Sequence, residues 1–199
     1  MKPGDTPALT VPHGACNVGR SGAGAGAGQT SLPRAAAVVR AFETAPVGGY
    51  GHPVLAGAAA MAAAHQMHAS AFRIVGDPGA DDTVRADAAR AVRAHAVACA
   101  AVVRRIDRWA ATTLPADRSG MLHTESLGQL VARMAAVRAH GRIPAGARAR
   151  DHDARARRAT AQLAELVCAF DDLATDLRLG RRRLPVRQTP DGPSGSAFL

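Results

Sequence analysis

Aromatic side chains are scarce in this sequence, which has one Trp, one Tyr and four Phe among 199 residues. Aromatic and β-branched residues favour strands, whereas alanine is the strongest helix former. The 47 alanines therefore predict an all-α fold. Because burying an alanine methyl removes far less apolar surface from water than burying a leucine, we expect the core to be thin.

Lysine is almost absent, since the 25 basic residues are 24 arginines and Lys2. Together with the abundant alanine, glycine and proline, this bias is as typical of high-GC codon usage as of selection for binding. The formal net charge of +9 is therefore weak support for a nucleic-acid partner. No aromatic residues are interleaved with the arginines, which argues against recognition of single-stranded nucleic acid by base stacking.

The sequence also lacks a CxxC pair, a secretion signal and an uninterrupted apolar run of membrane-spanning length. Cys16, Cys99 and Cys168 are widely spaced, so neither a disulfide framework nor a cysteine-based zinc site is indicated. The uncharged segment 44–72 is interrupted by prolines, glycines and three histidines. We expect a cytoplasmic protein with reduced thiols, no membrane segment and no cofactor.

Stretches rich in glycine, proline, serine and threonine are confined to the two ends of the chain. Residues 1–30 include the run SGAGAGAG, and residues 186–199 have the same character. Such segments cannot bury enough apolar surface to offset the entropy of the free chain. We expect a disordered tail over 1–30, one helical domain over 31–185 and a disordered tail over 186–199.

Five helical patterns occupy the central domain. A short one spans about Pro33 to Thr44, and a longer one spans about Pro53 to Val75. The third begins at a potential N-cap formed by Asp81, Asp82 and Thr83 and reaches about Ala111. Its larger side chains alternate in steps of four and three, as in antiparallel helices that pack side by side. These positions are Val92, Ala96, Cys99, Val103, Ile106 and Ala110.

The fourth and fifth helices carry clear end signals. Ser126 and Gln129 have the spacing of a capping box, which favours a helix start over a hydrolase triad made with His123 and Glu125. The fifth helix begins within ARARDHDARARR and ends at Gly180, which suits a left-handed C-cap. Four main helices joined by short loops predict an antiparallel up-down bundle, preceded by the short N-terminal helix.

Several of these segments resemble an actinobacterial family catalogued as domain of unknown function 4254. The resemblance rests on LHTESLGQLVARM at 122–134, LAELVCAFDDLATDLRLGRRRLP at 163–185, HP-x-L at 52–55 and R-x-I-D-x-W at 104–109. It covers roughly residues 51–185 and implies an all-helical bundle without an established activity. Residues 68–75 read HASAFRIV where relatives tend to carry a Trp and an acidic pair, so the chain resembles a divergent member.

Three histidines are the candidate ligands for a metal or a small molecule. His65 and His68 are three residues apart on one helix, and His95 on the next helix could approach them. No Glu-x-x-His pair occurs, which argues against a ferritin-like di-iron site. The alternative is that the histidines lie on partly exposed helix faces, and no bound metal is expected. Cys99 and Cys168 are interpreted as small core residues.

Two groups of arginines are candidates for binding phosphate or an acidic partner, since each guanidinium can make paired hydrogen bonds to an oxyanion. The alternative is that the first group lies in solvent at the start of the last helix, and that the second group interacts favourably with the negative end of the dipole of that helix. The two groups are Arg155, Arg157 and Arg158, and Arg181, Arg182 and Arg183.

Three functional hypotheses follow. The first is a non-catalytic binding or assembly protein, as a homodimer or with another protein, because an alanine-rich monomeric core is marginal. The second is an accessory enzyme or small-molecule-binding protein of specialised or glycan metabolism, with an interhelical pocket lined by His65, His68, His95 and Glu125. The third, an arginine-driven nucleic-acid binder, requires affinity that falls steeply with salt.

Overall fold

A computed structural model of the chain describes residues 30–44, 46, 49–115, 119–142 and 149–185. The two tails expected to be disordered lie outside the described residues, apart from Thr30. The described part is mostly helical, which confirms the all-α class. Its elements are α1 Ala35–Ala41, α2 Pro53–Val75, α3 Asp82–Thr113, β1 Met121–Leu122, α4 Leu127–Gly141, α5 Ala149–Arg178 and β2 Arg182–Arg183.

The helix ends follow the local signals in the sequence. The side chain of Asp81 accepts hydrogen bonds from the backbone N–H groups of Thr83 and Val84 and so caps α3. Ser126 and Gln129 form the expected capping box at the start of α4. Gly180 has a φ of 68°, the left-handed conformation that favours glycine after a helix.

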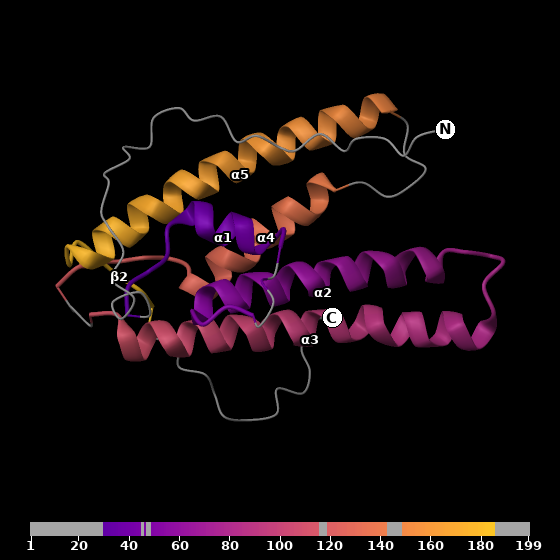
Figure 1. Ribbon diagram of the computed structural model, residues 1–199, viewed down its shortest axis with the longest axis horizontal. Coiled ribbons are helices and arrows are strands. Elements are labelled where there is room, and N and C mark those ends of the chain that lie inside the picture. Colours follow the sequence, from indigo (N-terminus) through magenta and orange to yellow (C-terminus); the bar gives the residue numbers. More distant parts are fainter. Residues whose placement is uncertain (1–29, 45, 47–48, 116–118, 143–148, 186–199) are drawn as a thin grey trace.

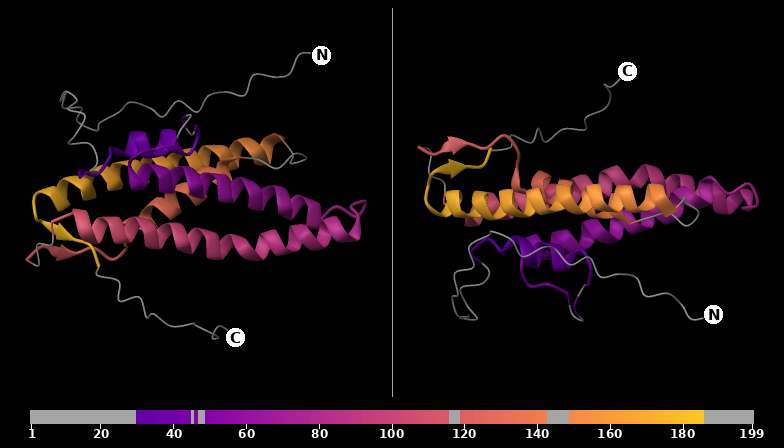
Figure 2. Two further views of the ribbon diagram at one scale, coloured as in Figure 1. Left: turned by 60° about the horizontal axis from the view of Figure 1, so that its bottom comes forward. Right: turned by 90° about the horizontal axis from the view of Figure 1, so that it is seen from above.

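The four long helices form two pairs, α2 with α3 and α4 with α5, and α4 lies between α5 and the first pair. Helices α2 and α3 run side by side as a long hairpin, while α4 contacts both of them and also pairs with α5 (Figures 1 and 2). Helix α1 lies against α2 and α5, where the Asp171 carboxylate accepts a 2.8 Å hydrogen bond from the Ala35 backbone N–H. The largest fully buried side chains are Val38, Val54, Met61, Ile106, Leu127, Leu130, Val131, Met134 and Phe170.

A short parallel strand pair, which the sequence analysis does not predict, closes one end of the molecule. Met121 and Leu122 of β1 pair with Arg182 and Arg183 of β2. At the bend before β1, a Cβ on Gly120 would lie 2.7 Å from the Gly180 carbonyl oxygen, so the close approach requires glycine. This pairing joins the segment that precedes α4 to the segment that follows α5.

The α2–α3 hairpin is longer than the helix that covers it. Helix α4 has 15 residues, α2 has 23 and α3 has 32. At 1.5 Å per residue these lengths are about 22, 35 and 48 Å. Because α4 is the shortest, it reaches only the start of the half of the hairpin that contains the turn (Figure 1). We call this half, residues 62–100, the distal hairpin.

Because of this difference in length, only part of the apolar seam predicted for α3 is buried. Val103, Ile106 and Ala110 are buried as predicted, whereas Ala96 is exposed. The prediction for Ala96 was wrong because α4 does not extend far enough to cover it. In the distal hairpin, α3 instead turns the partly buried His95 toward α2.

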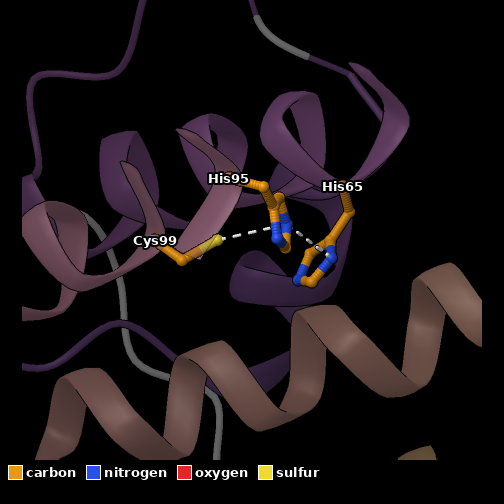
Figure 3. A group of neighbouring side chains, drawn as sticks. All are labelled: His65, His95 and Cys99. Carbon is orange, nitrogen blue, oxygen red and sulfur yellow. Dashed lines mark hydrogen bonds between the residues drawn. The ribbon is translucent and has the colours of Figure 1, made fainter. Parts of the chain in front are cut away.

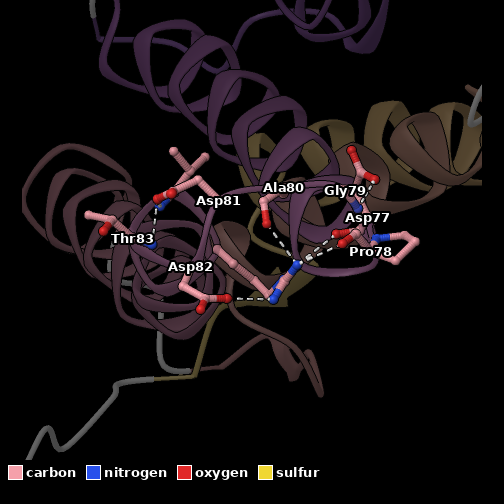
Figure 4. Close-up of polar contacts among 9 residues, drawn as sticks. Asp77, Pro78, Gly79, Ala80, Asp81, Asp82 and Thr83 are labelled. Carbon is pink, nitrogen blue, oxygen red and sulfur yellow. Dashed lines mark hydrogen bonds and ion pairs between the residues drawn. The ribbon is translucent and has the colours of Figure 1, made fainter.

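The turn of the hairpin is held by one guanidinium group. Nη2 of Arg85 lies 3.2, 3.3 and 2.8 Å from the carbonyl oxygens of Asp77, Pro78 and Ala80. Its Nη1 donates to the Asp82 carboxylate at 2.9 Å. Figure 4 shows these carbonyl groups converging on the inner side of the turn. The tip is therefore ordered by its own hydrogen bonds.

Candidate functional site

The candidate site lies between α2 and α3, where the two helices are held unusually close by Gly57. A Cβ on Gly57 would lie 2.6 Å from Cδ1 of Ile106 and 3.3 Å from Cγ1 of Val102. The helices can approach this closely only because Gly57 has no side chain. Two turns further along α2, the same approach brings His65 next to His95 of α3.

Three side chains with metal-binding atoms converge at this position (Figure 3). Nε2 of His95 lies 3.2 Å from Nδ1 of His65 and 3.4 Å from Sγ of Cys99. The ligand atoms of all three residues lie within 4.8 Å of one another. Each of the residues is partly buried, so the cluster is accessible to solvent. We call His65, His95 and Cys99 the His–Cys cluster.

His68 borders the His–Cys cluster on one side. Its ring centroid lies 4.3 Å from that of His95, with 34° between the ring planes. Its ring also lies near that of Phe72, one helical turn further on, with centroids 6.2 Å apart. The three histidines named from the sequence are therefore neighbours in the structure.

The surroundings favour the neutral forms of the His65 and His95 imidazoles and of the Cys99 thiol. Burial lowers the pKa of His65, and the nearby His95, His140 and His68 lower it further. Burial also lowers the pKa of His95, and His68 adds to this effect. Burial raises the pKa of the Cys99 thiol. A protonated thiol can donate its S–H to Nε2 of His95, or Nε2 of His95 can carry the proton and donate it to Nδ1 of His65.

Glu125, the fourth candidate from the sequence, does not join the histidines. Its carboxylate lies 2.6 Å from Nη2 of Arg133, beside the start of α4. The histidines lie near the opposite end of α4, because His140 in its last turn is close enough to affect the pKa of His65. The two ends of α4 are about 20 Å apart.

Cys99 was interpreted as a small core residue, and its place in the cluster was missed. The sequence did contain a signal, because His95 and Cys99 are four residues apart and therefore lie on one face of α3. Cys168 is exposed on α5. Cys16 lies outside the described residues.

The six arginines proposed as a basic patch fall into two separate places. Arg155, Arg157 and Arg158 are exposed in the first half of α5. Arg181 and Arg182 follow its last turn, where both pair with Asp176 at 3.0 and 3.2 Å. The remaining residue, Arg183, is partly buried in β2. About 30 Å of helix, from Arg158 to the end of α5 at Arg178, separates the two places, so one phosphate cannot contact both.

The segments that carry the family resemblance meet at a packed junction at the base of the hairpin. Oδ1 of Asp107 accepts a 2.7 Å hydrogen bond from the Gly128 N–H, where a Cβ would lie 2.5 Å from the Val103 carbonyl oxygen. The ring of His52 packs edge-on against Trp109, with centroids 4.8 Å apart. These contacts position α4 and the start of α2, which is a structural role.

The face of α2 that lines the core continues beyond the core. Val54, Met61 and Phe72 lie along one line of the helix, because steps of 7 and 11 residues at 100° per residue return to nearly the same direction. Val54 and Met61 are 0% exposed, whereas Phe72 is 64% exposed. Beyond the end of α4 this face has no cover within the described residues.

Comparison with known proteins places the chain within one family. The family model described as "Protein of unknown function (DUF4254)" matches residues 58–186. This range includes α2 from Ala58 onward, all of α3, α4 and α5, and the whole His–Cys cluster. No curated protein and no solved structure matches the chain. Among the helices of the described residues, none has the length and apolar character needed to cross a membrane.

Proposed function

We propose a function for a chain that belongs to the DUF4254 family of proteins of unknown function. In this proposal it is a non-catalytic assembly protein that pairs with a second copy of itself. The observation that carries this proposal is the exposure of Phe72 on the core-lining face of α2. Burying the large side chain of Phe72 would release more free energy than burying any of the alanines around it, because it has more apolar surface.

The distal hairpin contains most of the exposed large apolar side chains. Of the nine such side chains in the described part of the chain, six belong to α2 or α3: Met67, Phe72, Ile74, Val75, Val84 and Val97. By contrast, only Ala71 and Ala88 are buried between residues 62 and 100. Two helices with so little buried between them gain stability from further packing. A second hairpin supplies that packing.

The size of the uncovered face fits such a partner. The part of α3 that precedes His95, residues 82–94, is about 20 Å long, and two adjacent helices are about 20 Å wide, which gives a flat area of roughly 400 Å². A standard interface buries about 800 Å² of accessible surface per partner. The accessible area of a corrugated helix face exceeds its flat area, so the two values are of the same order.

The charges along α3 favour an antiparallel arrangement of two copies. The tip carries Asp77, Asp81, Asp82 and Asp87, opposed in the same segment only by Arg85. Further along α3 are the exposed arginines Arg90, Arg93, Arg104, Arg105 and Arg108. In a two-fold pair the acidic tip of each copy lies beside the basic part of the other. Other proteins therefore fit this face less well than a second copy.

Self-association would also produce a four-helix arrangement between two copies, which differs from the single-chain bundle of four main helices predicted from the sequence. Two hairpins that pack face to face contribute four helices, with Phe72 of each copy between them. We place this assembly in the cytoplasm, where conditions keep the thiols of Cys99 and Cys168 reduced. The geometry supports the pocket enzyme less, because Glu125 lies at the other end of α4 from the histidines.

Sedimentation velocity on the full chain, with a glutamate placed on either face of the hairpin, tests the proposal. We expect the wild type to be a dimer at micromolar concentration and Phe72→Glu to be a monomer, because a buried unpaired charge is costly in an interface. Val97→Glu is the matched control. Val97 is also exposed, but it lies nine residues after the buried Ala88 and so points away from the core.

Circular dichroism verifies that both variants keep their helix content. A wild type that stays monomeric at about 100 micromolar, well above the dissociation constant of a typical specific complex, contradicts the proposal. If Val97→Glu dissociates the dimer and Phe72→Glu does not, the contact lies on the opposite face of the hairpin. That result would contradict the proposal as well.

A further inference from the structure

We propose that His65, His95 and Cys99 bind one zinc ion, bridging α2 and α3 in the distal hairpin. The site goes beyond the proposed self-association and does not depend on it. It also differs from the expectation of no bound metal, for which the alternative was that the histidines lie on partly exposed helix faces. His65 is 30 residues before His95 in the sequence, and it becomes a neighbour of His95 and Cys99 only through the pairing of α2 with α3.

The donor atoms match the preference of zinc. Imidazole nitrogen and cysteine sulfur are its usual ligands, at about 2.0 to 2.1 Å and about 2.3 Å in a tetrahedral arrangement. These bond lengths require neighbouring ligand atoms to be about 3.3 Å apart for two nitrogens and about 3.6 Å apart for nitrogen and sulfur. The cluster has 3.2 Å between the nitrogens of His65 and His95 and 3.4 Å between His95 and Cys99.

The helical spacing supplies the correct directions. His95 and Cys99 are four residues apart on α3, the spacing by which zinc sites on helices place two ligands on one face. His65 contributes the third ligand from the adjacent helix. Gly57 and the buried Ala71 and Ala88 hold the helices close on both sides of the cluster. Small movements of the side chains therefore suffice to enclose an ion.

Zinc replaces the protons that join the three side chains in the absence of metal. The Cys99 S–H bond breaks, the thiolate binds the ion, and the proton goes to solvent. His65 binds through its Nδ1 lone pair and carries its proton on Nε2. His95 binds through its Nε2 lone pair and carries its proton on Nδ1. The net change is one zinc ion bound and one proton released.

Three protein ligands leave the fourth tetrahedral position open. The residues of the cluster are only partly buried, so water can occupy that position. His68 lies against the face of the His95 ring and limits its rotation. The bound ion would link the two helices at the place where the hairpin has the least apolar packing, and would thereby order the distal hairpin.

Cobalt substitution provides the first test, because Co²⁺ takes zinc ligands and shows a thiolate-to-metal charge-transfer absorption when cysteine is one of them. Tag-free, full-length protein freed of metal by a chelator is titrated with Co²⁺ and then with Zn²⁺. We expect one equivalent of Co²⁺ to give the thiolate absorption and one equivalent of Zn²⁺ to abolish it. Mg²⁺, which prefers oxygen ligands, should have no effect.

The three cysteines provide matched variants. Cys99→Ser should lose the thiolate absorption, whereas Cys16→Ser and Cys168→Ser should keep it. His65→Ala and His95→Ala, which remove ligands from different helices, should each weaken zinc binding at least about 100-fold. Because these side chains are partly exposed, the variants should keep the circular dichroism spectrum of the wild type.

Several results would overturn the site. These are the absence of a thiolate absorption in the wild type, its loss in Cys16→Ser or Cys168→Ser, and its persistence in Cys99→Ser. Unchanged zinc affinity in His65→Ala would exclude a bridge between α2 and α3. Sedimentation of Phe72→Glu with and without zinc separates the two proposals, since a monomer that binds one zinc supports the site whatever the oligomeric state.

Discussion

The distance between α2 and α3 depends on single side chains. Gly57 lies directly against Ile106, which is fully buried, and a Cβ on Gly57 would lie 2.6 Å from its Cδ1. The same close approach brings His65 to His95 two turns away. Gly57 has no side chain that could bind a metal, yet it determines whether His65 and His95 lie close enough to bind the same ion.

Gly57→Leu is expected to lower the free energy of unfolding by about 1 to 3 kcal/mol, because a larger side chain forces the buried helices apart. Urea denaturation of the metal-free protein measures the change. The matched control is Gly76→Ala, where the nearest atoms to the new Cβ lie 3.7 Å away and φ is −84°. This control should change the stability by less than about 0.5 kcal/mol. Equal effects of the two substitutions would contradict the role assigned to Gly57.

At the scale of elements, the hairpin tip depends on polar contacts more than on apolar packing. All the residues from Gly76 to Val84 are exposed except Ala80. The guanidinium of Arg85 joins three backbone carbonyl groups of this turn to the first residue of α3. Because one cation accounts for four contacts, its removal affects the whole turn.

Arg85→Ala should therefore increase amide hydrogen exchange across the tip by about fivefold, the equivalent of roughly 1 kcal/mol of local stability. Mass spectrometry of peptides that cover residues 76–86 measures the exchange. Arg90→Ala is the control, because Arg90 pairs only with the exposed Asp87 next to it on α3. We expect that variant to leave the tip unchanged. Faster exchange along the whole of α2 and α3 would indicate that Arg85 supports the entire hairpin.

For the whole molecule, the decisive feature is the unequal coverage of the hairpin. Its first half lies in the core with α1, α4 and α5, whereas its distal half has two helices with only Ala71 and Ala88 buried. Folding of the distal half is therefore linked to whatever binds it. Both proposals, a second copy and a zinc ion, concern this half.

If a second copy binds only the folded chain, the thermal midpoint must rise with protein concentration. We expect an increase of a few degrees between about 1 and about 100 micromolar for the wild type. Differential scanning calorimetry at several concentrations measures it. Phe72→Glu should show a midpoint independent of concentration, and Val97→Glu should behave as the wild type. A wild-type midpoint that does not move with concentration would argue against the dimer.

The sequence by itself determined the parts of this protein that depend on neighbouring residues. The cap at Asp81, the capping box of Ser126 and Gln129, and the left-handed Gly180 could be predicted because each forms within one turn of chain. The buried stripe of α5, with Leu163, Leu166, Phe170, Leu173 and Leu177, followed from helical periodicity.

Only the tertiary structure decided which of these faces are covered and which side chains meet. Ala96 and Phe72 fit the apolar pattern of their helices, but they are exposed because α4 ends before it reaches them. Cys99 joined His65, and Glu125 was separated from it, through the relative placement of α2, α3 and α4. Periodicity specifies the direction of a side chain on its own helix, whereas helix lengths and packing specify what lies opposite to it.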